Sequence, residues 1–95
     1  MIAVIATFSV RGGMEADFEQ LMAELAGQVR SGEPGCRLYQ LCKGQEPGKY
    51  VMMERYADQQ ALATHAQTPY FKAAMPRMGA LLEGRAGIQI LTEIA

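Results

Sequence analysis

Residues 2–10 read IAVIATFSV, a run of β-branched and aromatic residues in which neither of the two alternating faces carries a charge. In an extended chain one face would present five apolar side chains: Ile2, Val4, Ala6, Phe8 and Val10. The other face would present Ala3, Ile5, Thr7 and Ser9. A strand without a charged face is typical of an inner strand that is covered on both sides. The run therefore predicts a central strand.

The next stretch predicts a helix over residues 14–30, after a turn at Arg11-Gly12-Gly13. Its apolar side chains recur at helical spacing: Phe18, Leu21, Met22, Leu25 and Val29. The carboxylates early in this stretch and Arg30 at its end suit the helix dipole. The sequence Ser31-Gly32-Glu33-Pro34-Gly35 then ends the helix.

The rest of the chain predicts two strands, two short helices and a last strand. Residues 36–42 (CRLYQLC) and 49–56 (KYVMMERY) are expected to pair as strands across a hairpin turn at residues 43–48 (KGQEPG). We expect Asp58 to cap a helix that ends near His65. A second helix should start with Thr68 as N-cap and Pro69 in its first turn, and Pro76 should kink or break it. Residues 88–94 (IQILTEI) alternate as a final strand.

The order β-α-β-β-α-β predicts one domain over residues 1–95, with an antiparallel four-stranded sheet and helices on one face. The opposite face would be bare and apolar, and we expect it to include Val4, Phe8, Ile88 and Ile90 or their alternates. A large exposed apolar patch is unusual for a monomer. We therefore predict a homodimer in which two sheets pack face to face.

Composition narrows the function classes. The chain is 49% hydrophobic and 20% charged, with a formal net charge of −1, which gives no electrostatic basis for binding nucleic acid or anionic lipid. No apolar run reaches the roughly 18 residues that span a membrane, and no basic leader precedes residues 2–10. Cys36 and Cys42 are too far apart along one strand to form a disulfide. A reduced, cytoplasmic protein without a membrane partner is expected.

Several motifs resemble the antibiotic biosynthesis monooxygenase family in order and spacing. They are Glu33-Pro34-Gly35-Cys36, Tyr39, Met53-Glu54-Arg55-Tyr56, Ala61-Leu62-x-x-His65 and Thr68-Pro69-Tyr70-Phe71. The resemblance runs from about residue 2 to residue 94. It implies an α+β, ferredoxin-like protomer and a dimeric α/β barrel. The family includes cofactor-free oxygenases of quinols and aromatic polyketides, haem-degrading enzymes and a signal-molecule isomerase.

The sequence departs from two branches of that family. It contains no Trp and no Asn, on which the haem-degrading and polyketide-tailoring members depend. In the haem-degrading pattern, the Trp position falls on His65 and the iron-ligand position on Met75. Haem degradation is therefore not expected, and the chain is most similar to small bacterial quinol-monooxygenase-like members that carry His at the position of His65.

His65 is the candidate catalytic base, because it is the only side chain whose ordinary pKa lies near neutrality. A cofactor-free oxygenase must deprotonate a hydroquinone-type hydroxyl, orient the anion and exclude water. Ala61 and Leu62 place His65 on the apolar side of its helix. The alternative is a packing histidine, in the core or at an interface, that is hydrogen-bonded to a backbone carbonyl.

Glu54 interrupts an apolar strand face and is the second candidate catalytic residue. It could orient His65 or anchor a substrate hydroxyl. The alternative is an ion pair with an arginine such as Arg37. Tyr70, Phe71 and Met75 could line a substrate pocket between helix and sheet, or they could simply pack in the core.

No motif for a metal, flavin or nicotinamide is visible, and the seven methionines are scattered as gap-fillers would be. We therefore expect no cofactor. Two functions remain open. One is a monooxygenase that oxidises a small hydroquinone or related aromatic with dioxygen. The other is a dimeric module of the same fold that binds or senses a small ligand without catalysis.

Overall fold

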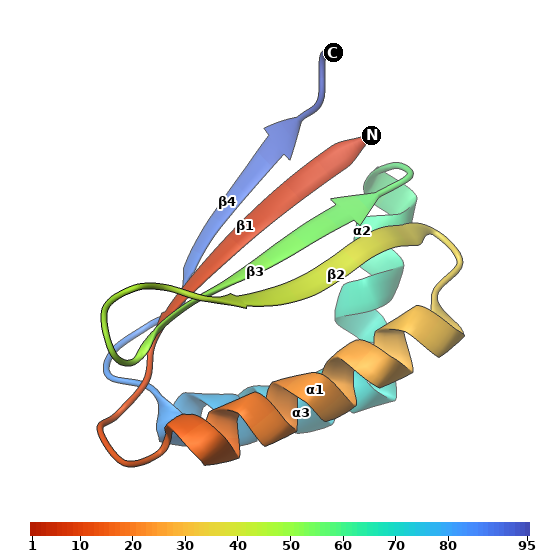
Figure 1. Cartoon of the computed structure of the whole chain (residues 1–95). Coiled ribbons are helices and arrows are strands. Elements are labelled where there is room, and N and C mark those ends of the chain that lie inside the picture. Colours follow the sequence, from red (N-terminus) through yellow and green to blue (C-terminus); the bar gives the residue numbers. More distant parts are fainter.

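The computed structural model describes residues 1–95. Its elements follow the predicted order: β1 (Ile2–Ser9), α1 (Glu15–Gly32), β2 (Cys36–Lys43), β3 (Lys49–Tyr56), α2 (Gln59–Gln67), α3 (Pro69–Leu81) and β4 (Gly87–Thr92). The strands form one antiparallel sheet in the order β2-β3-β1-β4, so β1 is an inner strand, as predicted. The three helices lie on the same side of this sheet (Figure 1). The fold is α+β and ferredoxin-like.

The main core lies between α1 and the face of the sheet that carries the even-numbered residues of β1. Helical spacing turns one side of α1 toward the sheet and buries Phe18, Leu21, Met22, Leu25, Ala26 and Val29. The Phe18 ring packs between Phe8 and Tyr50, at centroid distances of 5.3 and 4.9 Å. Gly13 has a φ of 86° in the turn before α1, a backbone conformation that residues with a Cβ rarely adopt.

The two short helices begin at the predicted caps. The Asp58 side chain accepts a hydrogen bond from the backbone N–H of Ala61, and Thr68 caps α3 by accepting one from Phe71. Pro76 lies inside α3, which continues to Leu81 without a break. Pro76 leaves the Lys72 carbonyl without its helical donor, but both residues are exposed, so water can take the place of the missing N–H.

The placement of the exposed apolar surface differs from the prediction. Val4 and Phe8 face the helices and are buried, because the even-numbered side of β1 is the one that α1 covers. Ile90 pairs with Val4 and therefore lies on the same face, yet it is 56% exposed, as β4 extends beyond the helices. Ile88 pairs with Ala6 and is 62% exposed. The opposite face is only partly apolar.

None of the three helices has the length and apolar character that crossing a membrane requires.

Candidate functional site

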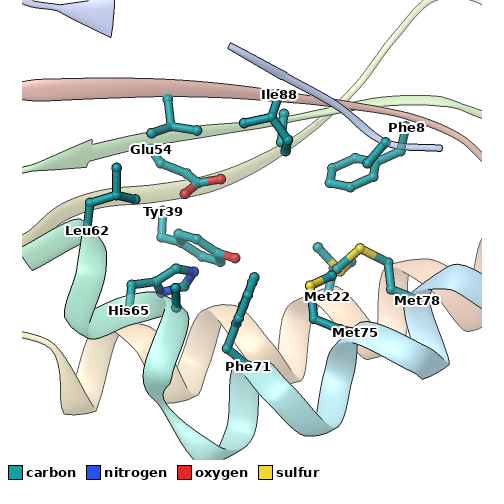
Figure 2. Close-up of a pocket in the computed structure, with 14 residues that line it drawn as sticks. Phe8, Met22, Tyr39, Glu54, Leu62, His65, Phe71, Met75, Met78 and Ile88 are labelled. Carbon is teal, nitrogen blue, oxygen red and sulfur yellow. The ribbon is translucent and has the colours of Figure 1, made fainter. Parts of the chain in front are cut away.

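A cavity of about 350 Å³ lies between the helix-facing side of the sheet and the helices α2 and α3 (Figure 2). Twelve of its fourteen lining residues are hydrophobic: Val4, Ala6, Phe8, Met22, Tyr39, Leu62, Ala66, Phe71, Met75, Met78, Ala86 and Ile88. The two others are Glu54 and His65. A concave, mostly apolar site with a few polar groups of defined position is the usual form of a small-molecule site.

His65 is held in place by a carboxylate from the end of another helix. It lies in the last turn of α2, whose start is fixed by the Asp58 cap. Its Nδ1 atom is 2.9 Å from Oε1 of Glu33 and 3.2 Å from Oε2. Glu33 directly follows α1, and the exposed fractions of Glu33 and His65 are only 6% and 3%. The pair therefore joins α1 to α2 inside the protein.

Further contacts restrict both partners of this pair. The Tyr70 hydroxyl, from α3, donates a hydrogen bond to the same Glu33 carboxylate. The His65 ring packs among three aromatic rings, with centroid distances of 4.5 Å to Phe71, 5.2 Å to Tyr39 and 5.5 Å to Tyr56. Packing and hydrogen bonding together limit the ring to one orientation.

The contact with Glu33 determines which nitrogen of His65 can act as a base. Burial lowers the pKa of His65, while the charge of Glu33 opposes this shift. In the neutral ring, a carboxylate at Nδ1 favours the tautomer with the proton on Nδ1. Nε2 then carries the lone pair. Nε2 makes no hydrogen bond within the protein. Every fully buried side-chain nitrogen or oxygen does have a hydrogen-bond partner, so Nε2 is not fully buried and a ligand can reach it.

Glu54 lies on the sheet wall of the cavity. Its Oε1 accepts a hydrogen bond from the Tyr56 hydroxyl at 2.6 Å, and the side chain is 8% exposed. Burial raises the pKa of Glu54 to about 7, against the effect of the Tyr56 hydrogen bond. Near neutral pH this carboxyl group can therefore be present in both its acid and its anionic forms.

Tyr39 supplies a third polar group to the cavity. A β-bulge between Cys36 and Leu38 shifts the register of β2, so that Tyr39 pairs directly with Glu54. The side chain is 4% exposed, and its hydroxyl has no hydrogen-bond partner within the chain. Figure 2 shows this hydroxyl pointing into the cavity beside Phe71. It is free to bind a ligand.

The structure brings four of the five predicted site residues together around the cavity: His65, Glu54, Phe71 and Met75. Tyr70 is the exception, because its hydroxyl turns toward Glu33 and its ring lies outside the lining. The suggestion that Glu54 orients His65 is wrong, since Glu33 makes that contact. Within the protomer, Glu54 makes no ion pair with Arg37, which is exposed, and binds Tyr56 instead.

Sequence reasoning missed two members of the site. Glu33 was interpreted only as part of a helix-ending turn, and a carboxylate before Pro-Gly is common in exposed turns. Tyr39 lies in the strand predicted over residues 36–42, and nothing in that stretch signals the bulge that brings it opposite Glu54. Both residues stood in the motifs that resembled the family, which was the one available signal.

Comparisons with known proteins agree with this fold. The family model described as antibiotic biosynthesis monooxygenase matches residues 1–77. A Caulobacter crescentus protein that is provisionally assigned as such a monooxygenase is 40% identical, with a TM-score of 0.95, and the match covers 99% of this chain and 90% of that one.

Two more distant structures have the same fold. Rv0793 from Mycobacterium tuberculosis is 29% identical, with a TM-score of 0.92 and coverage of 99% of this chain and 95% of that one. PA3566 from Pseudomonas aeruginosa is 27% identical, with a TM-score of 0.88 and coverage of 99% and 94%. No curated protein gives a significant match. From its fold, its motifs and the family match over residues 1–77, the chain belongs to the antibiotic biosynthesis monooxygenase family.

Proposed function

We propose that the protein is a cofactor-independent monooxygenase that oxidises a small hydroquinone or related aromatic with dioxygen. The observation that carries this proposal is the Glu33–His65 pair on the wall of an otherwise apolar cavity. A buried carboxylate that holds a neutral imidazole by Nδ1 directs the basic Nε2 atom to a substrate hydroxyl, which is the arrangement of a general base.

In the proposed reaction, Nε2 of His65 takes the proton of a substrate hydroxyl. The resulting anion is electron-rich and transfers electrons to dioxygen. One oxygen atom enters the ring and the other leaves as water. For a hydroquinone, the product is a hydroxyquinone, and the four electrons that reduce dioxygen all come from the substrate. The reaction therefore needs no external reductant.

The remaining groups have distinct parts in this proposal. Glu33 is a positioning residue, because it acts through His65. Tyr39 and Glu54 offer hydrogen bonds to the substrate oxygen as its charge changes. The apolar lining, completed by a second copy, excludes water, which would otherwise protonate the anion or divert the intermediate.

A homodimer forms part of the same proposal. Ile88 lines the cavity and is 62% exposed, so a wall of the site remains open to solvent in one protomer. Ile90 and Ile94 extend the exposed apolar surface along the end of the chain. A second copy packed against β4 would cover this surface and shield the cavity from water.

Oxygen uptake tests the catalytic proposal. A panel of reduced hydroquinones should give uptake above the uncatalysed rate with the wild-type protein. His65→Gln should reduce oxygen uptake to the uncatalysed rate, while ligand binding, measured by calorimetry, persists. Thr64→Ala is the control, because Thr64 is the exposed neighbour of His65 on α2. Binding without uptake in the wild type would instead support a non-catalytic sensing module.

A further inference from the structure

The polar groups of the cavity all lie at one end. Tyr39 pairs with Glu54, and Glu54 pairs with Val4 on the other side, so the two polar side chains occupy one row across the sheet. His65 faces this row from α2. Figure 2 shows these three residues together, with Phe8, Met22 and Met78 grouped at the opposite end.

The sheet register defines how far the apolar end extends. The row after Val4 contains Ala6 and Ile88, and the next contains Phe8. Each row lies roughly 6.5–7 Å from the one before, since alternate residues share a face. On the helix side, Phe71, Met75 and Met78 follow the same direction along α3, over about 10 Å. No lining residue beyond the polar row carries a charge or a polar side-chain group.

We infer that the ligand is an uncharged phenol-type molecule whose hydroxyl lies among Tyr39, Glu54 and His65 and whose apolar substituent extends past Ala6 toward Phe8. Once a second copy covers the open wall at Ile88, an anionic substituent at that end would lose its hydration and gain no partner. The small side chain of Ala6 leaves the space that the substituent occupies. Met22, Met75 and Met78 can adjust to its shape, because thioether side chains are flexible. This inference rests on the proposed function only in taking the cavity as the substrate site.

Calorimetry with three simple phenols tests it without any oxidation: phenol, 4-propylphenol and 3-(4-hydroxyphenyl)propanoate. The propyl compound should bind roughly 60-fold more tightly than phenol, as each of its three buried carbons contributes about fourfold. The propanoate has a similar length and should bind no better than phenol. Equal affinity for the propyl compound and the propanoate would overturn the inference.

Substitutions at Ala6 and Ile88, which pair in one row of the sheet, test where the propyl group binds. Ala6→Leu should remove most of the propyl gain and leave phenol affinity within about threefold of wild type. Ala3→Leu, on the opposite face of β1, is the matched control and should keep the full gain. Ile88→Lys should raise the affinity for the propanoate about tenfold, because it places an ammonium group in the Ala6 row. Since Ile88 is exposed within the protomer, this variant should fold even if Ala6→Leu does not, and ultracentrifugation shows whether it still associates.

The outcomes separate this inference from the catalytic proposal. Phenols that bind in the predicted order to a protein without oxygen uptake would support the inference and contradict the monooxygenase. Oxygen uptake would support the monooxygenase. If the affinity for phenols were at the same time unaffected by the propyl group, or by Ala6→Leu and Ile88→Lys, the inference about the substituent would be contradicted.

Discussion

Glu33 and His65 connect the end of α1 to the last turn of α2 through a 2.9 Å contact between Oε1 and Nδ1. Both side chains are buried, and Tyr70 binds the same carboxylate from α3. Three helices thus meet at one carboxylate, and the ring it holds lies on the wall of the cavity. This arrangement gives the histidine a fixed tautomer and a fixed direction.

The first prediction concerns Glu33→Gln. Because the charge of Glu33 raises the pKa of His65 against the effect of burial, its removal should lower that pKa further. Oxygen uptake should fall about 10- to 100-fold in kcat, since a hydrogen bond to a charged group contributes roughly 1.5–3 kcal/mol. An NMR titration of the His65 ring measures the pKa. Glu24→Gln, on the exposed side of α1, is the control. An unchanged or higher pKa would contradict the assigned role of Glu33.

The second prediction compares two tyrosines. Tyr56→Phe removes the donor to buried Glu54 and should lower the free energy of unfolding by about 1–3 kcal/mol. Tyr39→Phe removes a hydroxyl without a protein partner, so stability should change by no more than about 0.5 kcal/mol, while affinity for phenols should fall. Urea denaturation and calorimetry measure the two effects. Equal losses of stability would show that the Tyr39 hydroxyl has a structural role.

The third prediction is a pH dependence of stability that is due to Glu54. Its pKa in the folded protein, about 7, lies above its ordinary value of 4.5, so folding favours the protonated form. The contribution of Glu54 to the free energy of unfolding is fully present below about pH 4.5 and is lost as the pH rises through 7. The free energy of unfolding of the wild type should therefore contain a decline between pH 5 and pH 7.5 that Glu54→Gln lacks.

Urea unfolding of wild type and Glu54→Gln across this range measures the difference between their pH profiles. Taking the difference removes the opposite contribution of His65, whose lowered pKa favours folding at higher pH. Parallel profiles for the two proteins would show that Glu54 titrates normally.

The fourth prediction concerns the dimer. Ile90→Glu should shift the protein toward a monomer in analytical ultracentrifugation, because it would place a charge from each copy in the proposed interface. Met14→Glu adds the same charge at an exposed apolar residue in the turn before α1 and should leave association unchanged. A wild-type protein that stays monomeric at micromolar concentrations would contradict the homodimer.

The sequence predicted the fold well because its local signals agree with one another. The uncharged faces of residues 2–10 predicted the inner strand, and the Asp58 and Thr68 caps placed the starts of α2 and α3. Pro76 does not break α3, because the carbonyl that it leaves without a donor is exposed to water. The sequence left open which face of residues 2–10 the helices cover, since alternation separates two faces without showing which one is covered; the structure buries the face with Val4 and Phe8.

The site was predicted only in part, for a related reason. His65, Phe71 and Met75 could be placed on one side of their helices by spacing alone. Glu33 reaches His65 across 32 positions of the chain, and no local pattern encodes that contact. Tyr39 reaches the cavity through a β-bulge at the start of β2, and no turn residue marks it.

The pH dependence of oxygen uptake tests the central claim most directly. Besides the ionisation of Glu54 near pH 7, kcat/KM with a reduced hydroquinone as substrate should rise through an ionisation below pH 6.5, the ordinary pKa of histidine, that is due to His65. His65→Gln should lose both the uptake and this ionisation. A His65→Gln variant that kept the wild-type rate and pH profile would show that His65 is not the base.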